Sequence, residues 1–207
     1  MSSNPVQIKV CGITNLEDAL YLEAQDVQFL GFNFVKKSPR YVSPQKANEI
    51  IQELSPNTLA VGVFQNQSKE EIEQILSICD LDLLQFHGSE SPELLAQFEH
   101  QKIKVFSVTD DFDPQVLTAY DDIADYFLFD SKVGNTEGGT GQIFDWSRIE
   151  NISKKPFFLA GGIGPKNILE AWNQVKPWAF DLNSKIEVKP GLKDPLLFVE
   201  CMEALGK

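Results

Sequence analysis

The sequence predicts an α/β fold, a single-domain (β/α)8 barrel spanning residues 1–207. Short apolar runs rich in Val, Ile, Leu and Phe alternate along the whole chain with segments whose apolar residues recur at helical spacing. Eight such units leave about 26 residues each, near the lower limit for an eightfold barrel, whereas a doubly wound sheet commonly has five or six strands. No linker or change of composition divides the chain.

The expected strands are short, apolar and bounded by polar residues, as buried parallel strands are. They cover residues 7–11, 29–34, 58–64, 83–86, 103–108, 126–129, 156–160 and 178–182. Between them, helical spacing is found in residues 15–24, 44–54, 69–78 and 92–98.

Several helix starts are marked by a capping residue followed by proline, which fits the first helical position. These pairs are Ser43-Pro44, Ser91-Pro92, Asp113-Pro114, Gly164-Pro165 and Asp194-Pro195. Ser68 with Glu71 predicts a capping box at a further helix start.

The composition narrows the classes of partner. No apolar run follows the first residues, and no stretch approaches the roughly 18 apolar residues of a membrane span, so neither a signal peptide nor a membrane is expected. Three widely spaced cysteines without disulfide or zinc spacing indicate the cytoplasm. A net charge of −12 argues against nucleic acid, but it allows a small anionic substrate held by backbone N–H groups and one arginine. No metal is expected, and the chain is expected to be a monomer or a homodimer.

Two residues at strand ends are candidates for proton transfer, because barrel enzymes carry their chemistry there. Cys11 ends the first strand and precedes Gly12, and its thiol is either a buried structural group or a reactive one. Asp130 closes the apolar run 126–129, so it either caps the next segment or faces a cleft, where it could donate a proton.

Further strand-end residues are candidates for binding. Arg40 is either a clamp for a carboxylate or a solvated charge, and His87 either lines the site or is structural. Gly161 and Gly162, together with Ser184, suggest a phosphate cradle, with tight turns as the alternative. The glycine-rich stretch 138–141 resembles a flexible lid or a second contributor, and it lacks the ending of a P-loop.

Taken together, these motifs resemble the phosphoribosylanthranilate isomerase family over nearly the full length. The segments that carry the resemblance are Lys9-Val10-Cys11-Gly12-Ile13-Thr14, Gly31-Phe32, Ser38-Pro39-Arg40-Tyr41-Val42, Val61-Gly62-Val63-Phe64, Gln85-Phe86-His87-Gly88, Asp130, Gly138-Gly139-Thr140-Gly141, Phe144-Asp145-Trp146, Leu159-Ala160-Gly161-Gly162 and Pro190-Gly191-Leu192-Lys193-Asp194.

The resemblance implies a TIM barrel and an isomerase of tryptophan biosynthesis. Its reaction is the Amadori rearrangement of N-(5-phosphoribosyl)anthranilate to 1-(2-carboxyphenylamino)-1-deoxyribulose 5-phosphate, without a metal or organic cofactor. It implies that Cys11 is the general base, Asp130 the general acid and Arg40 the clamp for the anthranilate carboxylate. The remaining substrate-binding residues that we expect are His87, Gly139, Gly161, Gly162, Asp181, Asn183 and Ser184.

One departure and two alternatives accompany the resemblance. After Asp181 the commoner family pattern is Ser-Ser-Gly-x-Glu, whereas this chain has Asn183-Ser184-Lys185-Ile186-Glu187, which changes the expected phosphate contacts. A neighbouring barrel, such as indole-3-glycerol phosphate synthase or a histidine-pathway isomerase, would want a catalytic lysine at a strand end or aspartates after strands one and five. A non-catalytic phosphosugar-binding protein would have no need of Cys11 and Asp130.

Overall fold

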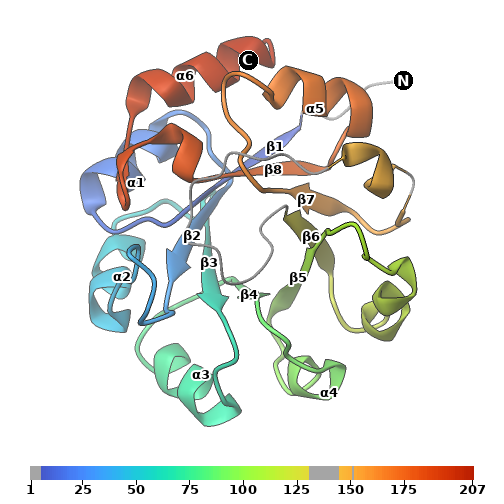
Figure 1. Cartoon of the computed structure of the whole chain (residues 1–207). Coiled ribbons are helices and arrows are strands. Elements are labelled where there is room, and N and C mark those ends of the chain that lie inside the picture. Colours follow the sequence, from blue (N-terminus) through green and yellow to red (C-terminus); the bar gives the residue numbers. More distant parts are fainter. Residues whose placement is uncertain (1–5, 131–144, 151) are drawn as a thin grey trace.

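A computed structural model describes residues 6–130, 145–150 and 152–207. Within them, eight parallel strands form a closed barrel in which each strand pairs with its neighbours in sequence and β1 pairs with β8, as Figure 1 shows. The strands are β1 (Gln7–Cys11), β2 (Phe29–Asn33), β3 (Leu59–Phe64), β4 (Leu83–Phe86), β5 (Gln101–Ser107), β6 (Tyr126–Asp130), β7 (Phe157–Leu159) and β8 (Ala179–Leu182). The predicted (β/α)8 barrel is confirmed.

Helices surround the barrel on its outside (Figure 1). The α-helices are α1 (Leu16–Ala24), α2 (Pro44–Ile51), α3 (Lys69–Leu76), α4 (Pro92–Leu95), α5 (Ile168–Val175) and α6 (Pro195–Ala204). Short 3-10 helices are η1 (Pro114–Tyr120), η2 (Trp146–Ile149) and η3 (Ser184–Ile186). The last helix, α6, closes the ring beside α1, where the rings of Tyr21 and Phe198 meet edge to face at 6.4 Å between centroids.

Most of the predicted helix starts are confirmed. Ser43, Ser91 and Asp194 cap helices whose first residue is proline, Asp113 does so for the 3-10 helix η1, and Ser68 forms the expected capping box.

The predicted start at Pro165 is wrong, because α5 begins only at Ile168. The side chain of Asn167 accepts a hydrogen bond from the Gly164 N–H (2.8 Å) and donates one to the Gly162 carbonyl (3.0 Å). These bonds hold residues 162–167 in a turn, so the helix starts one turn later than the proline suggests.

The apolar core has two layers. Phe29, Leu83, Leu128 and Phe158 belong to a cluster inside the barrel, where alternate residues of each strand point inward. A larger cluster fills the space between the strands and the helices. Since apolar side chains fill much of the interior, the polar inward residues gather at the carboxyl ends of the strands.

A two-stranded antiparallel hairpin, β9 (Glu187–Lys189) and β10 (Leu192–Lys193), follows β8 and was not expected from the sequence. Gly191 at its turn has φ of +80°, and its carbonyl accepts a hydrogen bond from the Thr14 hydroxyl (2.6 Å). The hairpin is therefore attached to the segment that follows β1. Of the helices in the described ranges, none has the length and apolar character needed to cross a membrane.

Candidate active site

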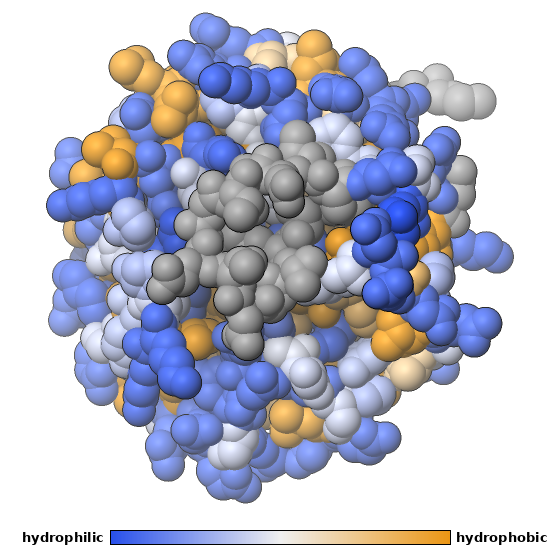
Figure 2. All heavy atoms as spheres, viewed as in Figure 1, coloured by the Kyte–Doolittle hydropathy of each residue, from blue (hydrophilic) through white to orange (hydrophobic). Residues whose placement is uncertain are grey.

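The inward-facing residues at the carboxyl ends of the strands line a cavity of about 580 Å3. Cys11, Asp130 and Asp181 lie on its wall, together with Arg40 and the turn at Gly162. Among the coloured residues in Figure 2, hydrophilic ones outnumber apolar ones on this face. Within the described ranges, no group of three or more His, Cys, Asp or Glu side chains is placed to hold a metal ion.

The thiol of Cys11 occupies space that Gly31 leaves open, and Gly12 leaves space for Arg40. A Cβ on Gly31 of the neighbouring strand would lie 2.9 Å from the Cys11 sulfur, so a larger residue there would displace the thiol. Gly12 has φ of +80°, a conformation that favours glycine, and a Cβ there would lie 2.6 Å from Cδ of Arg40. Burial raises the pKa of Cys11, while the charge of Lys9 opposes this, Asp181 adds to it and Lys193 opposes it.

A fully buried ion pair lies one layer deeper in the barrel. Lys9 Nζ donates to Asp181 Oδ2 at 2.8 Å, across the junction of β1 and β8. Burial lowers the pKa of Lys9, but Asp181 and then Cys11 outweigh it, so the pKa lies above its usual value. The Asp181 Oδ1 atom is buried without a hydrogen-bond partner in the described structure, and it lies beside the cavity.

His87 lies opposite Asp130 on the cavity wall, with 3.9 Å between Nε2 and Asp130 Oδ2. Its Nδ1 lies 3.4 Å from Nε2 of Gln85. Burial lowers the pKa of His87, although the nearby carboxylates of Asp130 and Asp181 oppose this. The imidazole is therefore neutral at physiological pH and can accept or donate a hydrogen bond.

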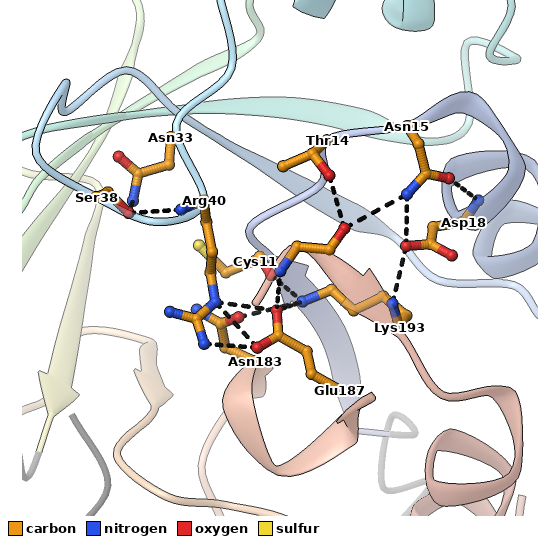
Figure 3. Close-up of polar contacts among 11 residues, drawn as sticks. Cys11, Thr14, Asn15, Asp18, Asn33, Ser38, Arg40, Asn183, Glu187 and Lys193 are labelled. Atoms are coloured by element: carbon orange, nitrogen blue, oxygen red, sulfur yellow. Dashed lines mark hydrogen bonds and ion pairs between the residues drawn. The ribbon is translucent and has the colours of Figure 1, made fainter. Parts of the chain in front are cut away.

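Arg40 is not a solvated charge, because its guanidinium group contacts a buried carboxylate (Figure 3). Its Nε lies 2.9 and 3.0 Å from the two carboxylate oxygens of Glu187, and its Nη2 lies 2.5 Å from Oε2. One edge of the Arg40 guanidinium group, formed by Nε and Nη2, thus binds the buried carboxylate of Glu187. The other edge, with Nη1, makes no hydrogen bond to the described residues.

The turn at Gly161 and Gly162 faces the segment that follows β8. The two glycines have φ of +86° and +73°, and the nearest atom that a Cβ on Gly162 would meet is Cε of Lys185, at 3.9 Å. Ser184 and Lys185 are exposed, and both line the cavity. The departure from the family pattern therefore adds a cation beside the expected phosphate cradle. Gly139 lies outside the described residues.

The structure brings together all the described residues that the sequence singled out: Cys11, Arg40, His87, Asp130, Gly161, Gly162, Asp181, Asn183 and Ser184 line the same cavity. The sequence interpretation missed three charged residues next to the site whose side chains are buried: Lys9, Glu187 and Lys193. Lys9 could have been found, because a lysine inside an apolar strand needs a buried partner. Glu187 and Lys193 lie on the unexpected hairpin.

The fold and this cavity define the class: an enzyme of the (β/α)8-barrel type with an acid, a thiol and a glycine turn at the carboxyl ends of its strands. A family model described as N-(5'phosphoribosyl)anthranilate (PRA) isomerase matches residues 8–204. The chain belongs to this family.

Relatives and solved structures agree with this assignment. An N-(5'-phosphoribosyl)anthranilate isomerase of Petrotoga mobilis is 43% identical over 202 residues, which are 97% of each chain. The crystal structure of phosphoribosyl anthranilate isomerase from Thermotoga maritima has a TM-score of 0.88 at 35% identity, covering 97% of this chain and 98% of that one. A phosphoribosyl anthranilate isomerase solved with reduced 1-(o-carboxyphenylamino)-1-deoxyribulose 5-phosphate has a TM-score of 0.85 at 33% identity, with the same coverage.

Proposed function

We propose that this chain rearranges N-(5'-phosphoribosyl)anthranilate to 1-(o-carboxyphenylamino)-1-deoxyribulose 5-phosphate in tryptophan biosynthesis, with Cys11 and Asp130 moving the protons. Membership of the family supports the reaction. The single observation that carries the assignment of roles is that both residues line one cavity, whose wall also holds Arg40 and the turn at Gly162.

Asp130 is the general acid in this proposal. It gives its proton to the ring oxygen of the ribose, the bond from that oxygen to C1′ breaks, and the lone pair of the anthranilate nitrogen forms a protonated imine. Its neighbour His87, kept neutral by burial, is placed to hydrogen-bond the opened sugar. A positioned acid contributes about 10²–10⁴-fold to the rate.

Cys11 is the general base. As a thiolate it takes the proton on C2′, which the neighbouring iminium carbon acidifies, and the electron pair neutralises the nitrogen to give an enolamine. Tautomerisation then places a proton on C1′ and leaves the ketone at C2′. The substrate itself is both oxidised at C2′ and reduced at C1′, so the electrons balance within one molecule.

The two ends of the substrate carry its charges, and the cavity offers a complement to each. At one end the exposed backbone at Gly161 and Gly162, with Ser184 and Lys185, suits the phosphate. At the other end the free edge of Arg40 suits the carboxylate of the anthranilate ring. Between them, the unpartnered Oδ1 of Asp181 and the side chain of Asn183 suit the hydroxyl groups of the ribose.

The decisive experiment is a turnover assay on the purified protein with phosphoribosylanthranilate, with product identified by NMR and mass spectrometry. Cys11→Ser and Asp130→Asn should each lose about 10²–10⁴-fold in kcat while keeping the far-UV circular dichroism spectrum of the parent. Near-normal turnover in either variant would remove that residue from the mechanism. Binding of the substrate without any product from the parent protein would support a non-catalytic phosphosugar-binding protein instead.

The compartment that we propose is the cytoplasm, and the partner is the small phosphoribosyl substrate. All three cysteines, Cys11, Cys79 and Cys201, are free and buried. Reduced thiols are typical of proteins of the cytosol, where glutathione and thioredoxin keep them so.

A further inference from the structure

A buried lysine that the family assignment does not explain lies next to the general base. Lys193 is 3% exposed, and its ammonium group donates to the backbone carbonyl of Cys11 at 2.6 Å. The same Nζ donates to Asn183 Oδ1 at 3.1 Å and to Glu187 Oε1 at 2.8 Å (Figure 3). All three hydrogens of the ammonium group therefore have acceptors, and one of them is the residue proposed to be the base.

The position of Lys193 is fixed by its own backbone. The Lys193 N–H donates to Asp18 Oδ2 at 2.9 Å, and Asn15 also donates to this oxygen at 2.8 Å. The preceding turn of the hairpin is held through the Thr14 hydroxyl, which donates to the Gly191 carbonyl. The segment that follows Cys11 thus holds the hairpin in place, and the ammonium group of Lys193 on this hairpin binds the Cys11 carbonyl.

Glu187 is shared between two cations. Its carboxylate accepts from Lys193 and, with both oxygens, from Arg40, while its side chain is only 3% exposed. Since one carboxylate faces two cations, this group of three side chains carries a net positive charge. The deeper pair of Lys9 and Asp181 matches one cation to one anion and is neutral as a unit.

The influences on the pKa of Cys11 differ in size and in sign. Burial, the largest influence, raises its pKa; the charge of Lys9 lowers it, Asp181 raises it in turn, and Lys193 lowers it again. Because Lys9 and Asp181 act in opposite directions, the net positive charge of Lys193, Arg40 and Glu187, two cations for one carboxylate, is the favourable charge that remains near Cys11.

We propose that Lys193 is the positioning residue of the general base: its ammonium group fixes the Cys11 backbone at the end of β1 and supplies positive charge that stabilises the Cys11 thiolate. The proposal rests on the assignment of Cys11 as the base. The carboxylate of Glu187 binds both Lys193 and Arg40. One residue therefore positions both the support of the base and the arginine proposed to bind the substrate carboxylate.

The test measures the thiolate directly and needs no substrate. The parent protein and Lys193→Met are treated with iodoacetamide at pH values from 7 to 11, and the rate of alkylation at Cys11 is followed by mass spectrometry. Burial raises the pKa of Cys79 and Cys201 to about 12, and both are at most 1% exposed, so Cys11 is the thiol that reacts. Loss of the cation should move the midpoint up by about one pH unit, or slow alkylation about tenfold below the midpoint.

Three further variants separate charge from structure. Lys193→Arg keeps the charge and should keep the midpoint near that of the parent. Lys193→Gln keeps N–H donors without charge, so it should shift the midpoint as Lys193→Met does, and it carries the test if the Met variant fails to fold. Lys104→Met is the matched control, because Lys104 is also 3% exposed and is paired with Glu90 at 3.0 Å; its midpoint should stay unchanged.

The turnover assay supplies a second readout. In Lys193→Gln, kcat/KM should fall about tenfold at pH values below the pKa of Cys11 and recover only above it, which loss of structure alone would not produce. An unchanged alkylation midpoint in both uncharged variants, or an equal shift in Lys104→Met, would overturn the proposal. A shifted midpoint in a protein whose parent does not turn over the substrate would leave the role of Lys193 standing and would instead refute the proposed function.

Discussion

Lys9 and Asp181 are joined by a buried ion pair that spans the junction of the first and last barrel strands, with 2.8 Å between Nζ and Oδ2. Lys9 is completely buried and Asp181 nearly so. Taking both charges out of water is costly, and only their mutual attraction and hydrogen bond offset that cost. The pair therefore links the first strand to the last, and Asp181 also lines the cavity.

Removing one partner of this pair should be more harmful than removing both. Lys9→Met leaves the Asp181 carboxylate buried and unpaired, and the free energy of unfolding should fall by about 3–5 kcal/mol. The double variant Lys9→Met/Asp181→Leu should recover most of that loss, because no buried charge remains. Urea denaturation followed by tryptophan fluorescence measures both. A double variant as unstable as the single one would contradict this account.

The rate should depend on pH with a sign that Cys11 determines. Burial raises the pKa of Cys11, so in the free enzyme near pH 7 the thiol is mostly protonated and is not a base. Below that pKa, kcat/KM should rise by about tenfold per pH unit as long as Asp130 keeps the proton that it donates, since kcat/KM reports the protonation states of the base and the acid in the free enzyme. Initial rates between pH 6.5 and 9.5, with fluorescence confirming the fold at each pH, check this. In Asp130→Asn, whose amide does not titrate, the residual kcat/KM should keep this slope, and a residual rate that is flat or falls between pH 7 and 8 would argue against a thiolate base.

Arg40→Ala should reduce kcat/KM by about 10- to 150-fold, the equivalent of a lost charge-assisted hydrogen-bonded contact of roughly 1.5–3 kcal/mol. A substrate analogue that has aniline in place of anthranilate serves as the control, because it offers no carboxylate to the arginine. Loss of the Arg40–Glu187 contact would affect both substrates equally. The difference between the losses in kcat/KM on the two substrates therefore measures how much Arg40 contributes to binding of the carboxylate. Equal losses would assign Arg40 a purely structural role.

Lys185→Gly, which restores the commoner family residue, should weaken competitive inhibition by inorganic phosphate about three- to tenfold. The substitution removes the cation beside the turn at Gly162. KM should rise with kcat nearly unchanged, since the phosphate does not take part in proton transfer. The matched control is Lys176→Gly, an exposed lysine outside the cavity whose φ of +48° suits glycine. A fall in kcat at constant KM would place Lys185 elsewhere in the mechanism.

The barrel and most of its cavity could be predicted because the signals are local. The runs that became β1 and β6 end in Cys11 and Asp130, and parallel strands must bring their carboxyl ends to the same face. Capping by Ser43 or Asp194 depends on residues within one turn. The prediction at Pro165 was wrong because it used only the residue pair at the expected start, whereas the hydrogen bonds of the Asn167 side chain decide where α5 begins.

The buried charges could not be predicted in the same way, since each depends on a partner distant in sequence. Lys193 binds the Cys11 carbonyl across 182 positions, and Arg40 meets Glu187 across 147. From the sequence alone, Arg40 was expected either to be solvated or to bind the substrate. Its partner in the structure, Glu187, lies on a hairpin whose two strands have only five residues together, too few to show a periodic pattern. Lys9 carried a usable signal, because its apolar strand requires an anion nearby.

The hairpin of β9 and β10 has a consequence for anyone who would re-engineer this barrel. Barrel folds support many chemistries by variation of their loops, which suggests that a single loop can be exchanged on a constant scaffold. Here the loop after β8 carries Glu187, which binds Arg40 of the loop after β2, and Lys193, which binds Cys11 at the end of β1. Grafting a foreign eighth loop would therefore alter three rim segments at once, and the unit to transplant is this hairpin together with residues 11–18 and 38–40.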